Sequence, residues 1–236
     1  MKVSLNWLKD YVKFDMPDRD YAELMTSTGT KVETIEKLGE DIENVVAGKI
    51  DSVTPHPDSD HLVICMVDVG GEKPLQIVTG AQNVHAGDFV PVCLNGAKLP
   101  GGKVIKSGKL RGVISEGMLC SLSELGLTVH DFPYAIEDGI FIMQEPCKPG
   151  DDIRDVLSLR DTVVDFELTF NRPDCLALLG IARETAASTG LPLVYDEPKV
   201  HTAGDGDSIE RRLSVTVREP ELCPRYTARA VKNVRI

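Results

Sequence analysis

The sequence predicts an α+β fold in which a small β-barrel lies between two helical parts of the chain. Three observations predict it: helical periodicity before about residue 40, closely spaced strands with glycine turns from about residue 45, and renewed helical periodicity after about residue 150. With 236 residues, 42% of them apolar, the chain is long enough to bury a sizeable core in one or two domains.

The first forty residues predict two short helices followed by an extended segment. Ser4 is placed to cap a helix over LNWLKDYV, and the stretch DMPDRDYAELMTST predicts a second helix that Gly29 ends. The following KVETIEKL is predicted to be extended. Because Asn6, Lys9 and Asp10 interrupt the apolar residues of the N-terminus, we expect no signal peptide and no membrane anchor. The mostly apolar neighbours of the cysteines predict a cytoplasmic protein.

The middle of the chain predicts short strands separated by glycine turns. The predicted strands are VVAGKIDSVT, LVICMVDVG, LQIVTG, DFVPVCLN and KVIKSGKLRGVIS. About five short strands within roughly a hundred residues are typical of a small closed barrel.

Beyond the barrel the sequence predicts a helix over DDIRDVL, a strand over VVDFELTF and a long helix over residues 175–189. Asp174 is the expected N-cap of the long helix and Gly190 its end. Gly180 inside this helix costs about 1 kcal/mol relative to alanine, so we expect it to pack closely against a neighbour. The predicted buried stripe consists of Cys175, Leu178, Leu179, Ala182 and Ala186.

The polar, glycine-containing residues 196–207 are predicted to form a linker. Residues 208–236 then predict the first strands of a new β-rich unit, too few to bury a core of their own.

Charge argues against the chain as a whole being a dedicated nucleic-acid binder, because its net charge is −11. One local cluster without acidic residues is the exception, and it comprises Lys98, Lys103, Lys106, Lys109 and Arg111. This basic stretch is either a solvated hairpin or a phosphate-contacting edge of the barrel. It has no aromatic residue for base stacking, which argues against sequence-specific binding.

The motif HPDSDHL, residues 56–62, has the composition of a metal site, but the turn chemistry of its proline and aspartates favours a loop between strands. In SEGMLCSLSELGL, the candidate nucleophiles Ser115, Cys120 and Ser121 have no nearby histidine or nucleophile elbow, which favours a strand followed by a short helix. The sequence thus predicts no catalytic residue and no metal ligand.

The six cysteines contain no C-x-x-C pair and are expected to be reduced.

The motif NRPDC, residues 171–175, predicts a structural elbow between a strand and a helix. The proline disfavours a helical conformation at Arg172, and we expect Arg172 to pair with an acidic residue of the same domain. A direct contact between Arg172 and tRNA is the alternative.

Several blocks in order resemble the beta subunit family of bacterial phenylalanyl-tRNA synthetase. They are MKVSLNWLKDYV, HPDSDHL, IVTGAQNV, GVISEGMLCSLSELGL, FNRPDCLALLGIARE and CPRYTARAVKNV, and together they extend over nearly the whole chain. Two positions depart from the family pattern: His61 stands where relatives often have lysine, and Phe170 where they usually have proline.

The resemblance implies an oligonucleotide-binding (OB) barrel, residues 41–150, inserted into a small α+β domain formed by residues 1–40 and 151–195. It implies that Trp7, Leu24 or Met25 lies near Leu178 or Leu179. Residues 208–236 resemble the start of the domain that hydrolyses mischarged tyrosyl-tRNA, in truncated form.

For function, the resemblance implies an N-terminal, non-catalytic part of an α2β2 ligase. The holoenzyme would use ATP and Mg2+ and contain a catalytic alpha subunit, and this part would contact tRNA(Phe) weakly or indirectly. No cofactor is expected in the chain itself. The alternative is a free-standing OB-fold module for tRNA binding or assembly, although the NRPDC and CPRYTARAVKNV blocks argue against it.

Overall fold

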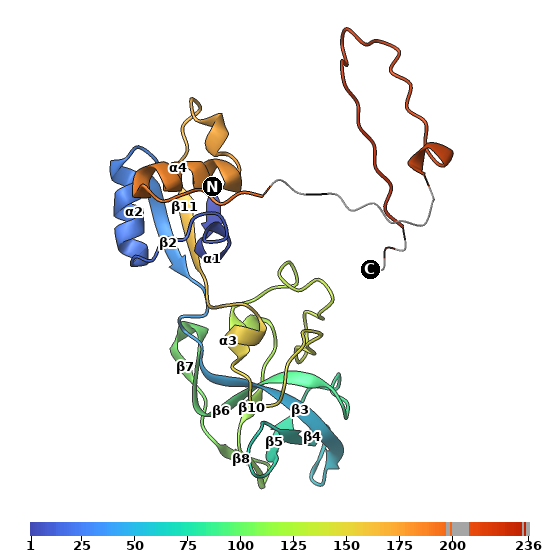
Figure 1. Ribbon diagram of the computed structural model, residues 1–236. Helices are drawn as coiled ribbons and strands as arrows, with labels where there is room; N and C mark the ends of the chain where they lie inside the picture. Colours follow the sequence, from blue (N-terminus) through green and yellow to red (C-terminus); the bar gives the residue numbers. More distant parts are fainter. Residues whose placement is uncertain (197–198, 200–207, 233, 235–236) are drawn as a thin grey trace. The chain divides into compact units, whose positions relative to one another are not determined.

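The computed structural model describes residues 1–196, 199, 208–232 and 234, and Figure 1 shows its elements. The chain divides into two compact units, residues 1–194 and residues 195–236. The first unit contains all the strands and α-helices of the described residues, and its mixture of antiparallel sheets and few helices gives it the predicted α+β class.

A three-stranded antiparallel sheet joins the two ends of the first unit. Its strands are β1 (Lys2–Ser4), β11 (Thr162–Phe166) and β2 (Val32–Lys37), with β11 in the centre. Val164 pairs with Val3 on one side and with Ile35 on the other. Because β1 and β2 are not paired with each other, the sheet exists only when β11 lies between them.

Three helices accompany this sheet: α1 (Leu5–Leu8), α2 (Asp18–Ser27) and α4 (Leu178–Thr189). Figure 1 shows α2 and α4 beside β2 and β11. As predicted, the Ser4 side chain caps α1 by accepting a hydrogen bond from the Trp7 amide, and Gly29 follows α2 with a positive φ of 114°. Met25 and Leu178 belong to the same apolar cluster, whereas Trp7 is 59% exposed.

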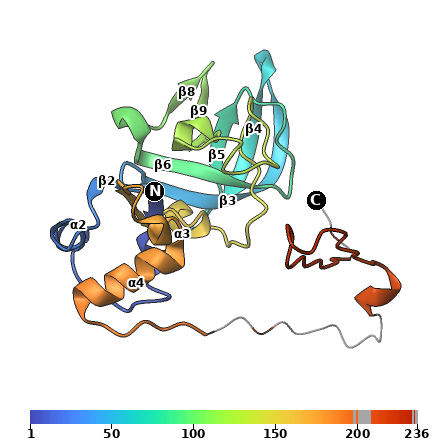
Figure 2. The same ribbon diagram turned by 90° about the horizontal axis from the view of Figure 1, so that it is seen from above.

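The barrel is a second antiparallel sheet with the strand order β10-β6-β3-β4-β5, and β7 pairs with β6. Figure 2 shows its two long strands, β3 and β6, side by side. The strand bounds are β3 (Glu43–His56), β4 (Ser59–Asp68), β5 (Leu75–Thr79), β6 (Phe89–Leu99), β7 (Lys103–Val104) and β10 (Met118–Leu119).

A separate hairpin, β8 (Gly108–Leu110) and β9 (Val113–Ser115), lies next to β5. The Glu116 amide donates to the Gln76 carbonyl oxygen at 2.8 Å, which brings β5 against the chain between β9 and β10 and closes the sheet. The stretch 103–115, predicted as one strand, is therefore three short ones. Arg111 and Gly112 both have positive φ and turn the chain between β8 and β9.

Two apolar clusters fill the barrel and its surroundings. One contains Ile50, Cys65, Val67 and Val90, and the other extends from Val45 to the helix α3 (Ile153–Val156). Ile153, Leu157 and Leu159 pack with the barrel, although they follow residue 150, where the barrel was expected to end.

The second unit contains one short 3-10 turn, η4 (Ile209–Arg211), and no strand among its described residues. The expectation of strands within 208–236 is thus wrong for these residues. Leu213, Val215 and Val217 alternate as they would in a strand, but all three are exposed. A stable strand needs a neighbouring strand to pair with and an apolar surface to cover one of its faces. The predicted linker 196–207 lies mostly outside the described residues. No helix in the described part of the chain is long and apolar enough to cross a membrane.

Candidate functional site

The basic stretch divides into paired and unpaired cations. The Lys98 ammonium lies 2.8 Å from a Glu43 carboxylate oxygen, and the Lys103 ammonium lies 3.0 Å from that of Glu124. Lys106 and Lys109 are exposed, and no acidic partner is found for them within the described residues. The structure therefore leaves the positive charge of the stretch concentrated near the β8–β9 hairpin.

Two neighbouring hairpins meet at the tip of this basic stretch. Pro57 and Asp58 form the turn between β3 and β4, so the loop predicted for HPDSDHL is present but only two residues long. The Arg111 guanidinium donates to the Asp58 carbonyl oxygen at 3.2 Å, and His56 approaches the Leu110 carbonyl oxygen at 3.1 Å. These contacts hold the two turns together.

Both ring nitrogens of His56 are engaged in this arrangement. Nδ1 accepts a hydrogen bond from the Asp58 amide at 3.0 Å, so the proton is on Nε2, which donates to Leu110. The side chain is 4% exposed. His56 therefore joins the hairpins and has no ring nitrogen left for a metal, while His61 is exposed in β4.

The candidate nucleophiles of the SEGMLCSLSELGL motif have structural partners. Ser115 is buried, accepts from the Val78 amide and donates to the Gly117 carbonyl oxygen. Cys120 is buried with its sulfur 3.2 Å from that of Cys93, and this contact, together with burial, raises the pKa of the Cys120 thiol. Ser121 and Glu124 bond each other's amides at the start of η2 (Ser123–Leu125), the short helix predicted there.

The NRPDC motif forms the predicted elbow, but its helix begins later than expected. Residues Pro173–Cys175 make a 3-10 turn, η3, and α4 starts at Leu178 with Ala177 as its N-cap. Asp174 is therefore not the N-cap of α4. Instead its carboxylate accepts hydrogen bonds from Arg172 and from the Cys175 thiol.

Arg172 makes the acidic pairing that the sequence predicted. Its Nη2 lies 3.0 Å from Asp174 Oδ2, 2.6 Å from Glu184 Oε1 and 3.2 Å from Cys175 Sγ. The hydrogen bond from Arg172 lowers the pKa of Asp174 to about 2. Burial, and then the hydrogen bond to Asp174, raise the pKa of the Cys175 thiol to about 11, so this thiol is protonated at neutral pH.

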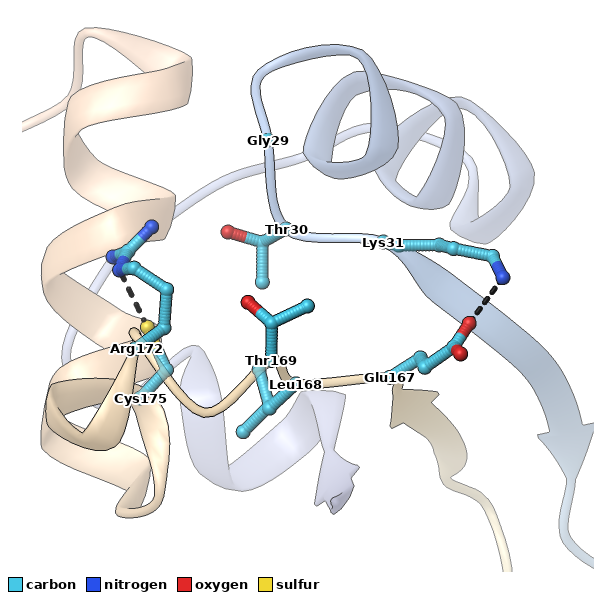
Figure 3. Close-up of a pocket in the computed structure, with 8 residues that line it drawn as sticks. All are labelled: Gly29, Thr30, Lys31, Glu167, Leu168, Thr169, Arg172 and Cys175. Carbon is cyan, nitrogen blue, oxygen red and sulfur yellow. Dashed lines mark hydrogen bonds and ion pairs between the residues drawn. The ribbon is translucent and has the colours of Figure 1, made fainter.

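A cavity of about 200 Å³ adjoins this cluster, between the end of α2 and the strand-to-helix elbow. Figure 3 shows Thr30 and Thr169 facing each other across it, with Arg172 and Cys175 on one side. The ion pair between Lys31 and Glu167 lies on the other side. Leu168 and Gly29 complete the lining.

Thr30 is the unusual member of this lining. The residue is 4% exposed, and its hydroxyl oxygen is buried with no hydrogen-bond partner among the described residues. A buried hydroxyl without a partner loses its hydration without compensation, which costs about 1–3 kcal/mol. Such a group in a polar cavity indicates room for a bound water or ligand.

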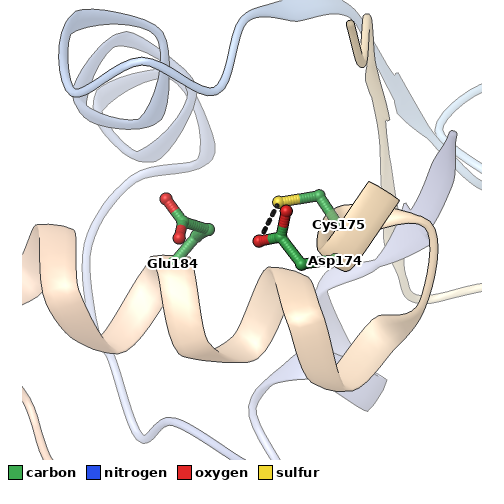
Figure 4. A group of neighbouring side chains, drawn as sticks. All are labelled: Asp174, Cys175 and Glu184. Carbon is green, nitrogen blue, oxygen red and sulfur yellow. Dashed lines mark hydrogen bonds between the residues drawn. The ribbon is translucent and has the colours of Figure 1, made fainter. Parts of the chain in front are cut away.

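The acidic cluster also contains a potential set of metal-ligand atoms. One donor atom each from Asp174, Cys175 and Glu184 lies within 4.8 Å of the others. Figure 4 shows Glu184 on α4 and the other two side chains on the preceding turn.

Sequence reasoning missed Thr30 and Glu184 as members of this site. Gly180 packs against the elbow, and Glu184 lies four residues later on the same face of α4. Helical spacing from Gly180 could therefore have predicted that Glu184 faces the elbow. No local pattern marks Thr30, because its burial depends on a chain segment about 140 residues away.

Residues 45–152 match a family model described as "Putative tRNA binding domain". This range contains the barrel strands from β4 to β10 and nearly all of β3, and it ends just before α3.

The whole chain is similar to proteins named phenylalanine–tRNA ligase beta subunit. It is 49% identical over 237 residues to the protein of Clostridium acetobutylicum, 47% over 237 residues to that of Clostridium tetani and 48% over 236 residues to that of Moorella thermoacetica. Each match covers 100% of this chain and 29% of the relative, so the chain spans less than a third of their length.

Among solved structures, the chain is similar to a MetRS-related protein from Pyrococcus horikoshii, with 22% identity and a TM-score of 0.32 over 45% of this chain and 85% of that one. It is also similar to the C-terminal domain of Plasmodium vivax p43, with 27% identity and a TM-score of 0.28 over 36% of this chain and 48% of that one.

Proposed function

We propose that the chain belongs to the phenylalanine–tRNA ligase beta subunit family and forms the N-terminal, non-catalytic part of such a subunit, because its full length matches 29% of the length of these relatives. The observation that carries this proposal is similarity over the entire chain, which includes the residues outside the tRNA-binding model. The complete enzyme would attach phenylalanine to tRNA(Phe) with ATP and Mg2+, as a cytoplasmic α2β2 assembly with a catalytic alpha subunit.

A non-catalytic role agrees with the chemistry of the described residues. Ser115 and Cys120 are buried in structural contacts, and the Cys120 thiol has a raised pKa, which disfavours the reactive thiolate. We therefore expect the 236-residue chain alone neither to exchange pyrophosphate with phenylalanine nor to deacylate tyrosyl-tRNA. Activity above a buffer blank in either assay, with the complete ligase as positive control, would contradict the proposal.

For the domain arrangement, we infer that the barrel is inserted into the small α+β domain. The pairing of β11 with both β1 and β2 supports this inference, because the sheet draws its strands from both sides of the barrel in sequence. Val3, Met25 and Ile181 lie in one apolar cluster that contains no barrel strand residue.

For RNA, we propose weak, non-specific contact through the basic stretch of Lys98, Lys103, Lys106, Lys109 and Arg111, led by the three cations near the β8–β9 hairpin. Lys98 and Lys103 contribute less because their charges are already paired with glutamates. Three phosphate contacts predict a slope of about −2 when the logarithm of affinity is plotted against that of salt concentration. The net charge of −11 and the lack of stacking side chains limit the affinity to about 10⁻⁴–10⁻⁶ M.

This contact is tested by titrating the chain with tRNA at several salt concentrations. The variant Lys106→Ala/Lys109→Ala/Arg111→Ala should weaken binding and flatten the salt slope, whereas the matched control Lys98→Ala/Lys103→Ala should change both less. Nanomolar affinity, or equal effects of the two variants, would show that another surface binds the RNA.

A further inference from the structure

One cationic nitrogen of Arg172 occupies the centre of a set of metal-type ligand atoms. Its Nη2 lies 2.6 Å from Glu184 Oε1, 3.0 Å from Asp174 Oδ2 and 3.2 Å from Cys175 Sγ. The three side chains therefore converge on a single position that already carries a positive charge. This convergence comes from two elements, since Glu184 belongs to α4 and the other two residues to η3.

The donor set has a defined metal preference. A thiol and two carboxylates suit a divalent ion of intermediate softness such as Zn2+ or Co2+, whereas Mg2+ and Ca2+ take oxygen ligands alone. Zinc binds sulfur at about 2.3 Å and carboxylate oxygen at about 2.0–2.2 Å. The three donors would thus need to move inward by roughly 1 Å or less from their present distances to the Arg172 nitrogen.

The adjoining cavity supplies an independent observation that points to a ligand. The cavity is lined by Arg172, Cys175 and Thr30, and the buried Thr30 hydroxyl has no hydrogen-bond partner within the part of the chain that the structure describes. In Figure 3 the Thr30 oxygen is directed toward the Arg172 side of the cavity. A site with three protein ligands leaves one position for water, and a water there would need a protein hydrogen-bond partner of this kind.

We propose that Asp174, Cys175 and Glu184 bind a zinc-like divalent cation, and that the Arg172 guanidinium occupies the site as an internal cation when no metal is bound. Metal binding releases the thiol proton to water and leaves the metal with one thiolate and two carboxylate ligands. The Arg172 side chain is 30% exposed and borders the cavity, so it can leave the cluster without disturbing the core. Thr30 then holds the water in the fourth position.

Cobalt provides the probe, because Co2+ occupies zinc sites and a thiolate–cobalt bond gives a near-ultraviolet charge-transfer band. The 236-residue chain is treated with a chelator and titrated with Co2+. Its absorption spectrum is compared with those of the variant Cys175→Ser and of the control variant Cys147→Ser. We expect a thiolate–cobalt band in the wild-type protein and in Cys147→Ser, and its loss in Cys175→Ser. No band in the wild type, or a band that persists in Cys175→Ser, overturns the proposal.

The role of Arg172 makes a second, signed prediction. Removing a positive charge from the centre of a cation site strengthens metal binding even when the effective dielectric constant is about 20, so Arg172→Gln should bind Co2+ at least about tenfold more tightly. Arg160→Gln is the matched control, because Arg160 also pairs with two carboxylates, those of Asp152 and Asp155, but contacts no thiol among the described residues. Circular dichroism establishes that both variants are folded. Unchanged or weaker cobalt binding by folded Arg172→Gln would contradict the competition between arginine and metal.

Discussion

At the scale of single residues, Thr30 shows how a buried hydroxyl can cost stability. Its hydroxyl has no partner among the described residues, whereas the buried Thr185 hydroxyl lies 2.8 Å from that of Tyr21. Thr30→Val should therefore raise the free energy of unfolding by about 1 kcal/mol, because it removes an uncompensated polar group at nearly constant volume.

The matched control for this change is Thr185→Val, which should lower the free energy of unfolding by about 1–2 kcal/mol, because it leaves the Tyr21 hydroxyl without a partner. Urea denaturation of both variants in metal-free buffer measures the difference. If Thr30→Val were destabilising there, a tightly held water would already satisfy the hydroxyl.

Ionisation of Tyr21 should lower the free energy of unfolding at alkaline pH. Burial raises its pKa to about 12, although the hydrogen bond to Thr185 opposes this effect. Because the pKa in the folded state lies above the unfolded value of about 10, the stabilising contribution is complete below pH 10 and is lost as the pH rises toward 12. The free energy of unfolding should fall over this window, and the fall should be shallower in Tyr21→Phe. Equal pH dependence of the two proteins would show that Tyr21 is not the responsible group.

The residues of the elbow show how far local sequence chemistry extends. The prediction that Arg172 pairs with an acidic residue is confirmed by Asp174 and Glu184. The prediction that Asp174 caps the helix is wrong, because the pairing with Arg172 engages the carboxylate and the chain makes a 3-10 turn before α4. Local propensity identified the polar groups correctly, but a contact with the next helix decided their partners.

At the scale of elements, the close approach of η3 to α4 depends on Gly180. A Cβ built on this glycine would lie 1.8 Å from the Asp174 carbonyl oxygen, which is backbone and cannot move aside easily. Gly180→Ala should therefore lower the free energy of unfolding by about 3 kcal/mol or more, despite the better helix propensity of alanine.

Gly80→Ala is the control for this substitution, since its Cβ would meet only ordinary contacts at 3.7 and 3.8 Å. Thermal unfolding of the two variants should separate them clearly. Equal midpoints would mean that the elbow can shift away from α4 at little cost.

The elements themselves were predicted where local chemistry is sufficient. Alternating or continuous apolar runs identified the strands that form β3 to β6, and glycine with a cap residue identified α1 and the end of α2. The stretch 103–115 was predicted as one strand because nothing in its apolar pattern marks the turn at Arg111. The strands expected within 208–236 were not found among the described residues, since strand formation depends on partners that local sequence does not specify.

At the scale of the whole molecule, the register of the small sheet allows a direct test of the insertion proposal. Lys37 at the end of β2 is the ladder partner of Thr162 at the start of β11. A short turn such as Asn-Gly, with a flanking residue on each side, can therefore join them in place of residues 38–161.

The shortened chain should fold cooperatively and retain the α2–α4 packing, because its apolar cluster contains no barrel strand residue. Nuclear magnetic resonance spectra with dispersed amide signals would support this outcome. A shortened chain without dispersed signals, beside a well-folded intact chain, would show that the barrel is required for the small domain to fold.

The central position of β11 has a consequence for the order of events during synthesis. The strands β1 and β2 leave the ribosome early, yet among the described residues both of them pair only with β11. Roughly 125 further residues must be translated before Thr162 appears, which takes about 6–25 s at ~5–20 residues per second. During this interval the barrel strands can pair with one another, whereas β1 and β2 remain unpaired and accessible to chaperones. The nascent chain should therefore acquire protease resistance in the barrel first and in its N-terminal segment last.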